Sequence, residues 1–171
     1  MLARTLTPLA LLAALGSASC DSGSLFDPSL TLGLFVDVTA EPNPAVATSA
    51  AGETFMVGDE TVEFEWKTSF RIISAIDEDQ VQATITSLAL LVRQATGGII
   101  IVPPPGQEER FRYDTRTDGN IIPPATSKAS EFDVWYTLPN QGREAVMTVT
   151  VGYINDSGLT RSETVTLRVA P

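Results

Sequence analysis

The chain has 171 residues, of which 43% are hydrophobic and 19% are charged, so one globular domain and a short leader account for its length. Its formal net charge is −10, and it has no histidine and a single cysteine. The acidic balance opposes binding to nucleic acid through a basic patch. The lack of histidine removes the commonest general base and neutral metal ligand, and one cysteine excludes a disulfide within the chain.

Residues 1–19 have the order of a secretory signal. Arg4 supplies a positive charge, Leu9–Leu15 is an apolar run, and Gly16–Ser19 is built from small residues. The apolar run is too short to cross about 30 Å of hydrocarbon as a permanent helix. We therefore predict a signal peptide at residues 1–19 and export of the mature chain.

The residues that end this segment, Ser17-Ala18-Ser19-Cys20, resemble the lipobox of bacterial lipoproteins. Ala18 and Ser19 fit its small-residue positions, and Ser17 stands where the family usually has leucine. The resemblance implies that Cys20 becomes the mature N-terminus and carries acyl chains such as palmitate, which anchor the protein to an inner or outer membrane. The alternative is ordinary cleavage after Ala18 or Ser19, which leaves Cys20 as a free thiol.

Residues 20–29 form a short polar tether in which Gly23 and Pro28 break regular structure. At about 3.5 Å per residue this tether reaches at most about 35 Å. A domain that follows it would sit close to the membrane.

From Leu30 onward apolar residues alternate with polar ones, which is the period of half-buried strands. The clearest example is Thr61–Lys67, where Val62, Phe64 and Trp66 share one face, and we expect Trp66 to lie in the core. We expect residues 121–130 to form a loop, and Ile99–Val102 to be an edge strand because prolines follow it. The other expected strands are Leu30–Thr39, Phe55–Val57, Phe70–Ile76, Phe111–Tyr113, Phe132–Leu138, Met147–Tyr153 and Val165–Val169.

The segment Val81–Arg93 fits two structures. A strand alternation that runs to Ile85 resumes at Leu88 on a shifted register, and a bulge near Thr86-Ser87 would reconcile the two parts. Helical spacing of its apolar residues also fits. The β-branched residues around Ile85 favour the strand.

Short strands with regular turn signals, and no expected helix, predict a single all-β sandwich over residues 30–171. Asn155-Asp-Ser-Gly158 is typical of a hairpin turn. The hairpin segment Ala145–Val169 resembles the closing strands of bacterial immunoglobulin-like and fibronectin type III-like domains. That resemblance implies an immunoglobulin-like β-sandwich.

No catalytic arrangement is complete in the sequence. Lys67-Thr68-Ser69 lacks the further residues that serine–lysine enzymes use. Glu63 and Glu65 are two positions apart, as expected for the solvent-facing side of a strand. The acidic runs 77–79 and 114–120 offer oxygen ligands for calcium, but they also suit ordinary turns, which is the reading we adopt. We predict no catalytic residue, no metal site and no cofactor.

Trp135 is the one aromatic residue with an unusual expected orientation. If its neighbours Val134 and Tyr136 point inward, Trp135 lies on the outer face of its strand. An outward tryptophan either contacts a ligand or packs under a loop, here Ile99–Pro105. We take Trp135 and Tyr113 as the candidate ligand-binding residues.

These observations favour a non-enzymatic lipoprotein of the cell envelope, whose β-sandwich is a structural or protein-interaction module. An alternative is a carbohydrate-binding module that uses Trp135 and Tyr113. A hydrolase is the third and weakest hypothesis.

Overall fold

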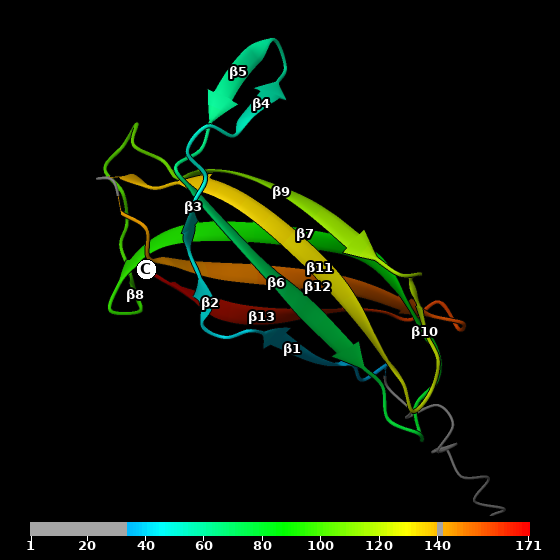
Figure 1. Cartoon of the computed structure of the whole chain (residues 1–171). Coiled ribbons are helices and arrows are strands. Elements are labelled where there is room, and N and C mark those ends of the chain that lie inside the picture. The colour runs from blue at the N-terminus through cyan, green and yellow to red at the C-terminus, as the bar shows by residue number, and fades with distance from the viewer. Residues whose placement is uncertain (1–33, 140–141) are drawn as a thin grey trace, which may run out of the picture. The chain divides into compact units, whose positions relative to one another are not determined.

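The computed structural model describes residues 34–139 and 142–171. Contacts between residues divide the chain into two units, 1–31 and 32–171, and every described residue belongs to the second. The described residues form a two-layered β-sandwich without an α-helix (Figure 1). The expected strand Leu30–Thr39 lies partly outside the described residues.

One layer, sheet A, has five strands. Its members are β1 (Asp37–Glu41), β3 (Thr48–Ser49), β6 (Trp66–Ala75), β9 (Arg110–Thr117) and β11 (Ser127–Thr137). They follow the order β1-β6-β11-β9, and β3 pairs with the end of β6 that β1 leaves free. All of these pairings are antiparallel.

The other layer, sheet B, has six strands. Its members are β2 (Ala45–Val46), β7 (Ala83–Thr96), β8 (Ile99–Ile100), β10 (Ile121–Ile122), β12 (Ala145–Asn155) and β13 (Thr160–Ala170). They follow the order β10-β7-β12-β13-β2, and β8 pairs with the far end of β7. The short β2 runs parallel to β13, and the other pairings are antiparallel.

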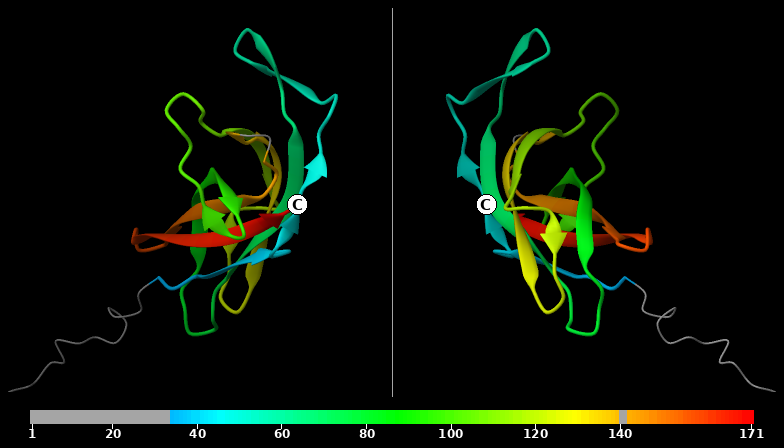
Figure 2. Two further views of the ribbon diagram at one scale, coloured as in Figure 1. Left: turned by 90° about the vertical axis from the view of Figure 1, so that its left-hand side faces the viewer. Right: turned by 90° about the vertical axis from the view of Figure 1, so that its right-hand side faces the viewer.

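A separate hairpin of β4 (Thr54–Val57) and β5 (Glu60–Glu63) extends beyond the end of the sandwich (Figures 1 and 2). The expected strand at Phe55–Val57 is thereby confirmed. The expected strand Thr61–Lys67 is wrong in its continuity, because the chain bends at Phe64-Glu65 between β5 and β6. The bend lets the two halves of the segment pack in different places.

The main core lies between the two sheets and is built from the alternating residues that the sequence indicates. Phe132, Val134 and Tyr136 of β11 point inward as expected, and Phe132 stacks on Phe70 of β6 with ring centroids 5.1 Å apart. Trp66 packs against this core and is half-buried. Burial of this alternating apolar face holds the layers together.

One buried hydrogen bond joins the two layers. The hydroxyl groups of Tyr153 in β12 and Ser74 in β6 lie 2.7 Å apart. Burial raises the pKa of Tyr153 to about 12, while the hydrogen bond to Ser74 opposes part of that rise. Both polar groups are therefore satisfied within the apolar interior.

The segment Val81–Arg93 lies mostly within β7, so the strand prediction is confirmed and the helical alternative is wrong. Gly152 pairs with Ser87 and Tyr153 pairs with Ile85, which leaves Thr86 as the extra residue of a bulge, as the sequence indicates. A Cβ atom on Gly152 would lie 2.4 Å from the Ser87 hydroxyl oxygen. Glycine at this position lets the bulged strand approach β12.

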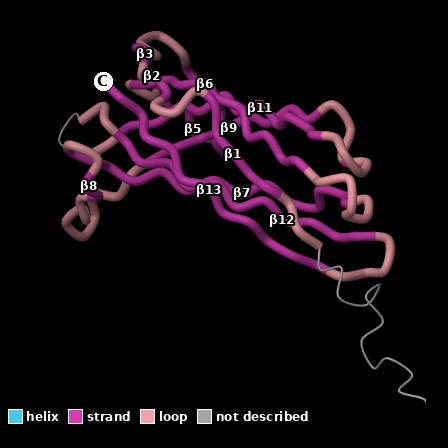
Figure 3. Tube along the Cα trace, turned by 90° about the horizontal axis from the view of Figure 1, so that it is seen from below, coloured by secondary structure: helices cyan, strands magenta, loops and turns pink. Residues whose placement is uncertain are grey.

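The loop expected at residues 121–130 contains more strand than predicted. Ile121 and Ile122 form β10 beside β7, and β11 begins at Ser127. Seen from below, long strands dominate the described chain and short loops connect them (Figure 3). None of the described residues belongs to a helix long and apolar enough to span a membrane.

Candidate functional site

Trp135 lies on the outer face of sheet A, as the alternation predicts, but it is only 7% exposed. Its cover is the β4–β5 hairpin, not the expected segment Ile99–Pro105. The rings of Phe55 and Trp135 lie 4.8 Å apart, and Phe64 joins the same small apolar cluster. This second cluster is separate from the main core.

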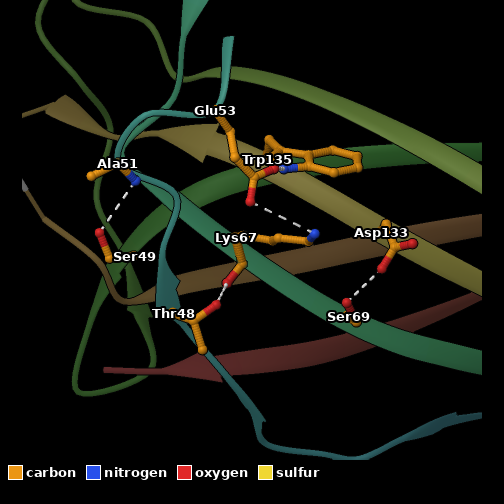
Figure 4. A network of polar contacts seen from close by, with 8 residues as sticks. All are labelled: Thr48, Ser49, Ala51, Glu53, Lys67, Ser69, Asp133 and Trp135. Atoms are coloured by element: carbon orange, nitrogen blue, oxygen red, sulfur yellow. Dashed lines mark hydrogen bonds and ion pairs between the residues drawn. The ribbon is translucent and has the colours of Figure 1, made fainter. Parts of the chain in front are cut away.

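The polar parts of this cluster are also paired (Figure 4). The indole nitrogen of Trp135 donates a hydrogen bond of 2.6 Å to a carboxylate oxygen of Glu53. The Lys67 ammonium lies 4.7 Å from the centre of the indole ring and 3.9 Å from the other oxygen of Glu53. The N–H group and one face of the indole are therefore occupied by residues of this chain.

Tyr113 points toward the interior from β9. Its ring lies 6.0 Å from that of Phe132, and its hydroxyl donates to the Leu88 carbonyl at 3.4 Å. The structure therefore places Tyr113 and Trp135 on opposite faces of sheet A. They do not form one aromatic platform.

The rest of the outer face of sheet A carries a ladder of charged and polar pairs. The Ser69 hydroxyl donates to Asp133 at 2.5 Å, beside the Trp135 cluster (Figure 4). Arg71 pairs with Glu41 at 2.9 Å. Further along β9 and β11, Arg112 pairs with Asp114 and Arg116 pairs with Glu131. Neighbouring charges of opposite sign neutralise one another across this face.

The acidic residues that the sequence singled out are engaged in local structure. Glu63 accepts a hydrogen bond from the Gly52 N–H, and Glu65 lies in the bend, where its own N–H donates to Thr137. The Asp77 carbonyl closes a turn by accepting from the Gln80 N–H. Within residues 34–139 and 142–171, no three acidic, cysteine or histidine side chains are grouped closely enough to hold a metal ion.

Sequence reasoning missed the cover over Trp135 and its polar partner Glu53. The available signal was the pair Phe55 and Phe64, two aromatic residues on either side of the Gly58-Asp59 turn. An aromatic hairpin of this kind needs an apolar surface to pack on, because two strands alone are marginally stable in water. The outward Trp135 supplies that surface.

Sequence reasoning also missed a buried carboxylate beside the β7 strand of sheet B. The Glu109 side chain is 2% exposed, accepts a hydrogen bond of 3.0 Å from the Gln94 N–H, and pairs with Arg93. Its hydrogen bond to the Gln94 N–H lies next to Ala95 and Thr96, the residues of β7 that pair with β8. Nothing in the local sequence distinguishes Glu109 from its neighbour Glu108.

Comparison with known proteins adds no relative from which a role could be transferred. No protein-family model matches the chain, and no curated protein matches it significantly. The predicted signal peptide and Cys20 lie outside the described residues.

Proposed function

We propose that this chain is a non-enzymatic lipoprotein of the cell envelope, exported and anchored by lipid at Cys20, with an immunoglobulin-like sandwich as a structural or protein-interaction module. The observation that carries the proposal is the solitary Cys20 directly after a charged, apolar and small-residue leader. Lipidation accounts for both the position and the solitude of this cysteine, because a free thiol is a liability in an oxidising compartment.

The interior and the outer face of sheet A support a binding role over catalysis. Lys67, the lysine of the Lys67-Thr68-Ser69 triplet, interacts with Glu53 and Trp135. The hydroxyl of Ser69 is committed to Asp133. A serine–lysine enzyme needs the lysine as a free base within hydrogen-bond reach of the serine, and here Lys67 pairs with Glu53 while Ser69 donates to Asp133.

The immunoglobulin-like assignment is supported by the last hairpin. The strands β12 and β13 pair along ten residue positions from Ala145 to Ile154 and close the centre of sheet B. Two antiparallel layers around one core are the architecture that such domains share. Fold alone does not assign a partner.

The observation that favoured the carbohydrate-binding alternative does not hold in the structure. It required outward aromatic rings at Trp135 and Tyr113, and the first is covered by a hairpin while the second faces the interior. We therefore propose a protein partner or a structural role.

The anchoring is tested by fractionating cells that produce the wild type or Cys20→Ser. We expect the wild type in the membrane fraction, where only detergent releases it, since several acyl chains bind almost irreversibly. The Cys20→Ser variant should lack that behaviour, and Ser24→Ala in the tether serves as a matched control. Equal membrane association of both variants would contradict lipid anchoring at Cys20.

The binding role is tested by crosslinking the anchored protein in intact cells. A specific envelope protein should be recovered repeatedly with the wild type. Turnover of an ester, glycoside or peptide library by the purified mature chain would contradict the non-enzymatic assignment.

A further inference from the structure

Among the described residues, one edge of sheet B has no neighbouring strand along most of its length. The strand β7 pairs with β12 on one side, but on the other side it pairs only with β10 at one end and β8 at the other. Single backbone bonds extend these two contacts to Ile85, which donates to the Asn120 carbonyl, and to Gln94, which accepts from Ile101. Between them, no strand within residues 34–139 and 142–171 pairs with this side of the eight residues from Thr86 to Arg93.

The alternation of a strand decides which groups this edge presents. The Ala95 N–H donates toward the β12 side, to the Glu144 carbonyl, whereas the Gln94 N–H and carbonyl point the other way. The N–H and carbonyl groups of Val92, Leu90 and Leu88 therefore also point away from β12. Apart from the Leu88 carbonyl, which accepts from Tyr113 at 3.4 Å, no hydrogen bond of the described chain reaches them from that side.

The composition of this edge is unusual for an exposed strand. The stretch from Thr86 to Arg93 has no proline, and its one charged residue is Arg93 at the end, which pairs with Glu109. Natural edge strands normally carry charges or prolines that prevent further pairing. The edge of sheet A shows the usual protection, because Arg110, Arg112 and Asp114 occur at alternate positions of β9.

Exposed apolar side chains lie along this edge and beyond both of its ends. Leu91 is 43% exposed on the outer face of β7, and Ile121 of β10 is exposed beyond one end of the unpaired stretch. At the other end Ile99 is 74% exposed and Val102 is 86% exposed. Leu91 therefore offers an exposed apolar side chain beside the unpaired stretch, and the others lie beyond its two ends.

The segment that carries Ile99 is held in place before any partner binds. Both carboxylate oxygens of Glu144 accept hydrogen bonds from the turn, at 2.9 Å from the Gly97 N–H and 2.7 Å from the Gly98 N–H. Glu109 fixes the adjacent Gln94 N–H. A preformed surface loses less conformational entropy when a partner binds.

We propose that the β7 edge from Thr86 to Arg93 binds an extended, uncharged segment of another protein, which adds to sheet B as a strand between β10 and β8. This inference deepens the proposed protein-interaction function and depends on it. The Leu88 N–H and the N–H and carbonyl groups of Leu90 would bond the segment, whereas Val92 is 1% exposed and the Leu88 carbonyl already accepts from Tyr113. Apolar side chains at alternate positions of the segment would pack beside Leu91.

The length of the unpaired stretch between β10 and β8 favours this occupant. Eight residues span about 26 Å, which admits one extended segment between β10 and β8. A dimer could also form if two copies paired their β7 edges in antiparallel fashion. In that arrangement the β10 strand of each copy would overlap with the β8 strand of the other copy. The unpaired stretch therefore suits a single strand with nothing attached at its edge.

The test uses the mature full-length protein and a fluorescein-labelled octapeptide of alternating threonine and valine. Fluorescence anisotropy should show saturable binding to the wild type. The same peptide with N-methyl groups on alternate residues cannot donate to the edge, and we expect it to bind about tenfold more weakly or not at all. Equal binding of both peptides, or no binding of the first, would overturn the proposal.

Two variants locate the site. Leu91→Lys places a charge beside the edge and should weaken peptide binding by about tenfold, since a charged edge opposes strand addition. Thr166→Lys places the same charge on the same outer face, two strands away on β13, and should leave binding unchanged. Equal weakening by both variants would show that net charge, and not the β7 edge, governs binding.

Hydrogen exchange of the Leu88 and Leu90 amides distinguishes the occupants. In the free protein these amides should exchange fast, and saturating peptide should slow them by about tenfold or more. Protection without peptide at every protein concentration would assign the edge to another segment of this chain, and concentration-dependent protection would assign it to a second copy. Either result overturns the proposal. Loss of membrane anchoring without loss of peptide binding would instead refute only the proposed envelope function.

Discussion

The hairpin over Trp135 is the feature whose energetics the structure predicts most sharply. Replacing Phe55 with alanine removes the ring that lies 4.8 Å from Trp135 and 5.8 Å from Phe64. Met56, the next residue along β4, is exposed and has no place in that cluster, so Met56→Ala is a matched control. A Trp66→Phe background leaves Trp135 as the one tryptophan in the chain.

The expected magnitude follows from burial. Removal of a fully buried phenylalanine costs about 3–5 kcal/mol, and Phe55 is half-buried, so the docked hairpin should lose about 2 kcal/mol. This loss raises the equilibrium constant for hairpin opening by about 30-fold. The cost falls mainly on the docked hairpin, because the cluster is separate from the main core.

Iodide quenching of the remaining tryptophan measures this opening. In the Trp66→Phe background the emission should be blue-shifted and weakly quenched, since the indole is buried. Phe55→Ala should raise the quenching constant toward that of an exposed indole, and Met56→Ala should not. Unchanged quenching in Phe55→Ala, or an equal rise in both variants, would refute the assignment of the hairpin as the cover of Trp135.

Three further changes test the packing and the polar network, each by urea unfolding. Trp66→Phe should change the free energy of unfolding by less than about 1 kcal/mol, because the lost apolar area is offset by removal of a buried indole N–H that has no partner among the described residues. Tyr153→Phe should reduce the loss of stability between pH 10 and pH 12: the folded protein favours the neutral hydroxyl, whose pKa is raised to about 12, so this contribution is complete below pH 10 and is lost as pH rises through that window. An equal loss in the wild type and the variant would contradict that account. Glu109→Ala should cost about 1–3 kcal/mol, because the partly buried Gln94 N–H loses its partner, whereas Glu108→Ala should cost almost nothing. Equal costs for the two glutamates would show that the burial of Glu109 has no energetic consequence.

The sequence predicted the parts of the fold that depend on local alternation. Inward residues of β11 and β12 recur at every second position, and a slip of one residue would turn the whole apolar face to water. The bulge at Thr86 was predictable for the same reason, since a change of phase within one strand requires an extra residue. The β-branched residues around Ile85 correctly favoured a strand there.

The parts that the sequence did not predict depend on contacts distant along the chain. Glu53 and Trp135 are separated by 82 positions, and neither side chain indicates its partner. The bend at Phe64-Glu65 has no glycine or proline to mark it. Glu109 is buried because Arg93 and the Gln94 N–H meet it, which only the fold determines.

The candidate aromatic site illustrates the limit of alternation as a guide to function. The pattern correctly placed Trp135 on the outer face of its strand, but whether an outward side chain meets solvent depends on what covers that face. The hairpin that covers it here lies more than seventy positions earlier in the sequence. The unpaired edge of β7 was hidden for a related reason, because the pairing of a strand is a property of its neighbours.

The intact mass of the protein purified from the membrane fraction tests the central claim most directly. The account predicts a chain that begins at Cys20 and carries the added mass of a diacylglyceryl group, with residues 1–19 removed. An unmodified chain that retains Met1 and is recovered from the cytosol would contradict it.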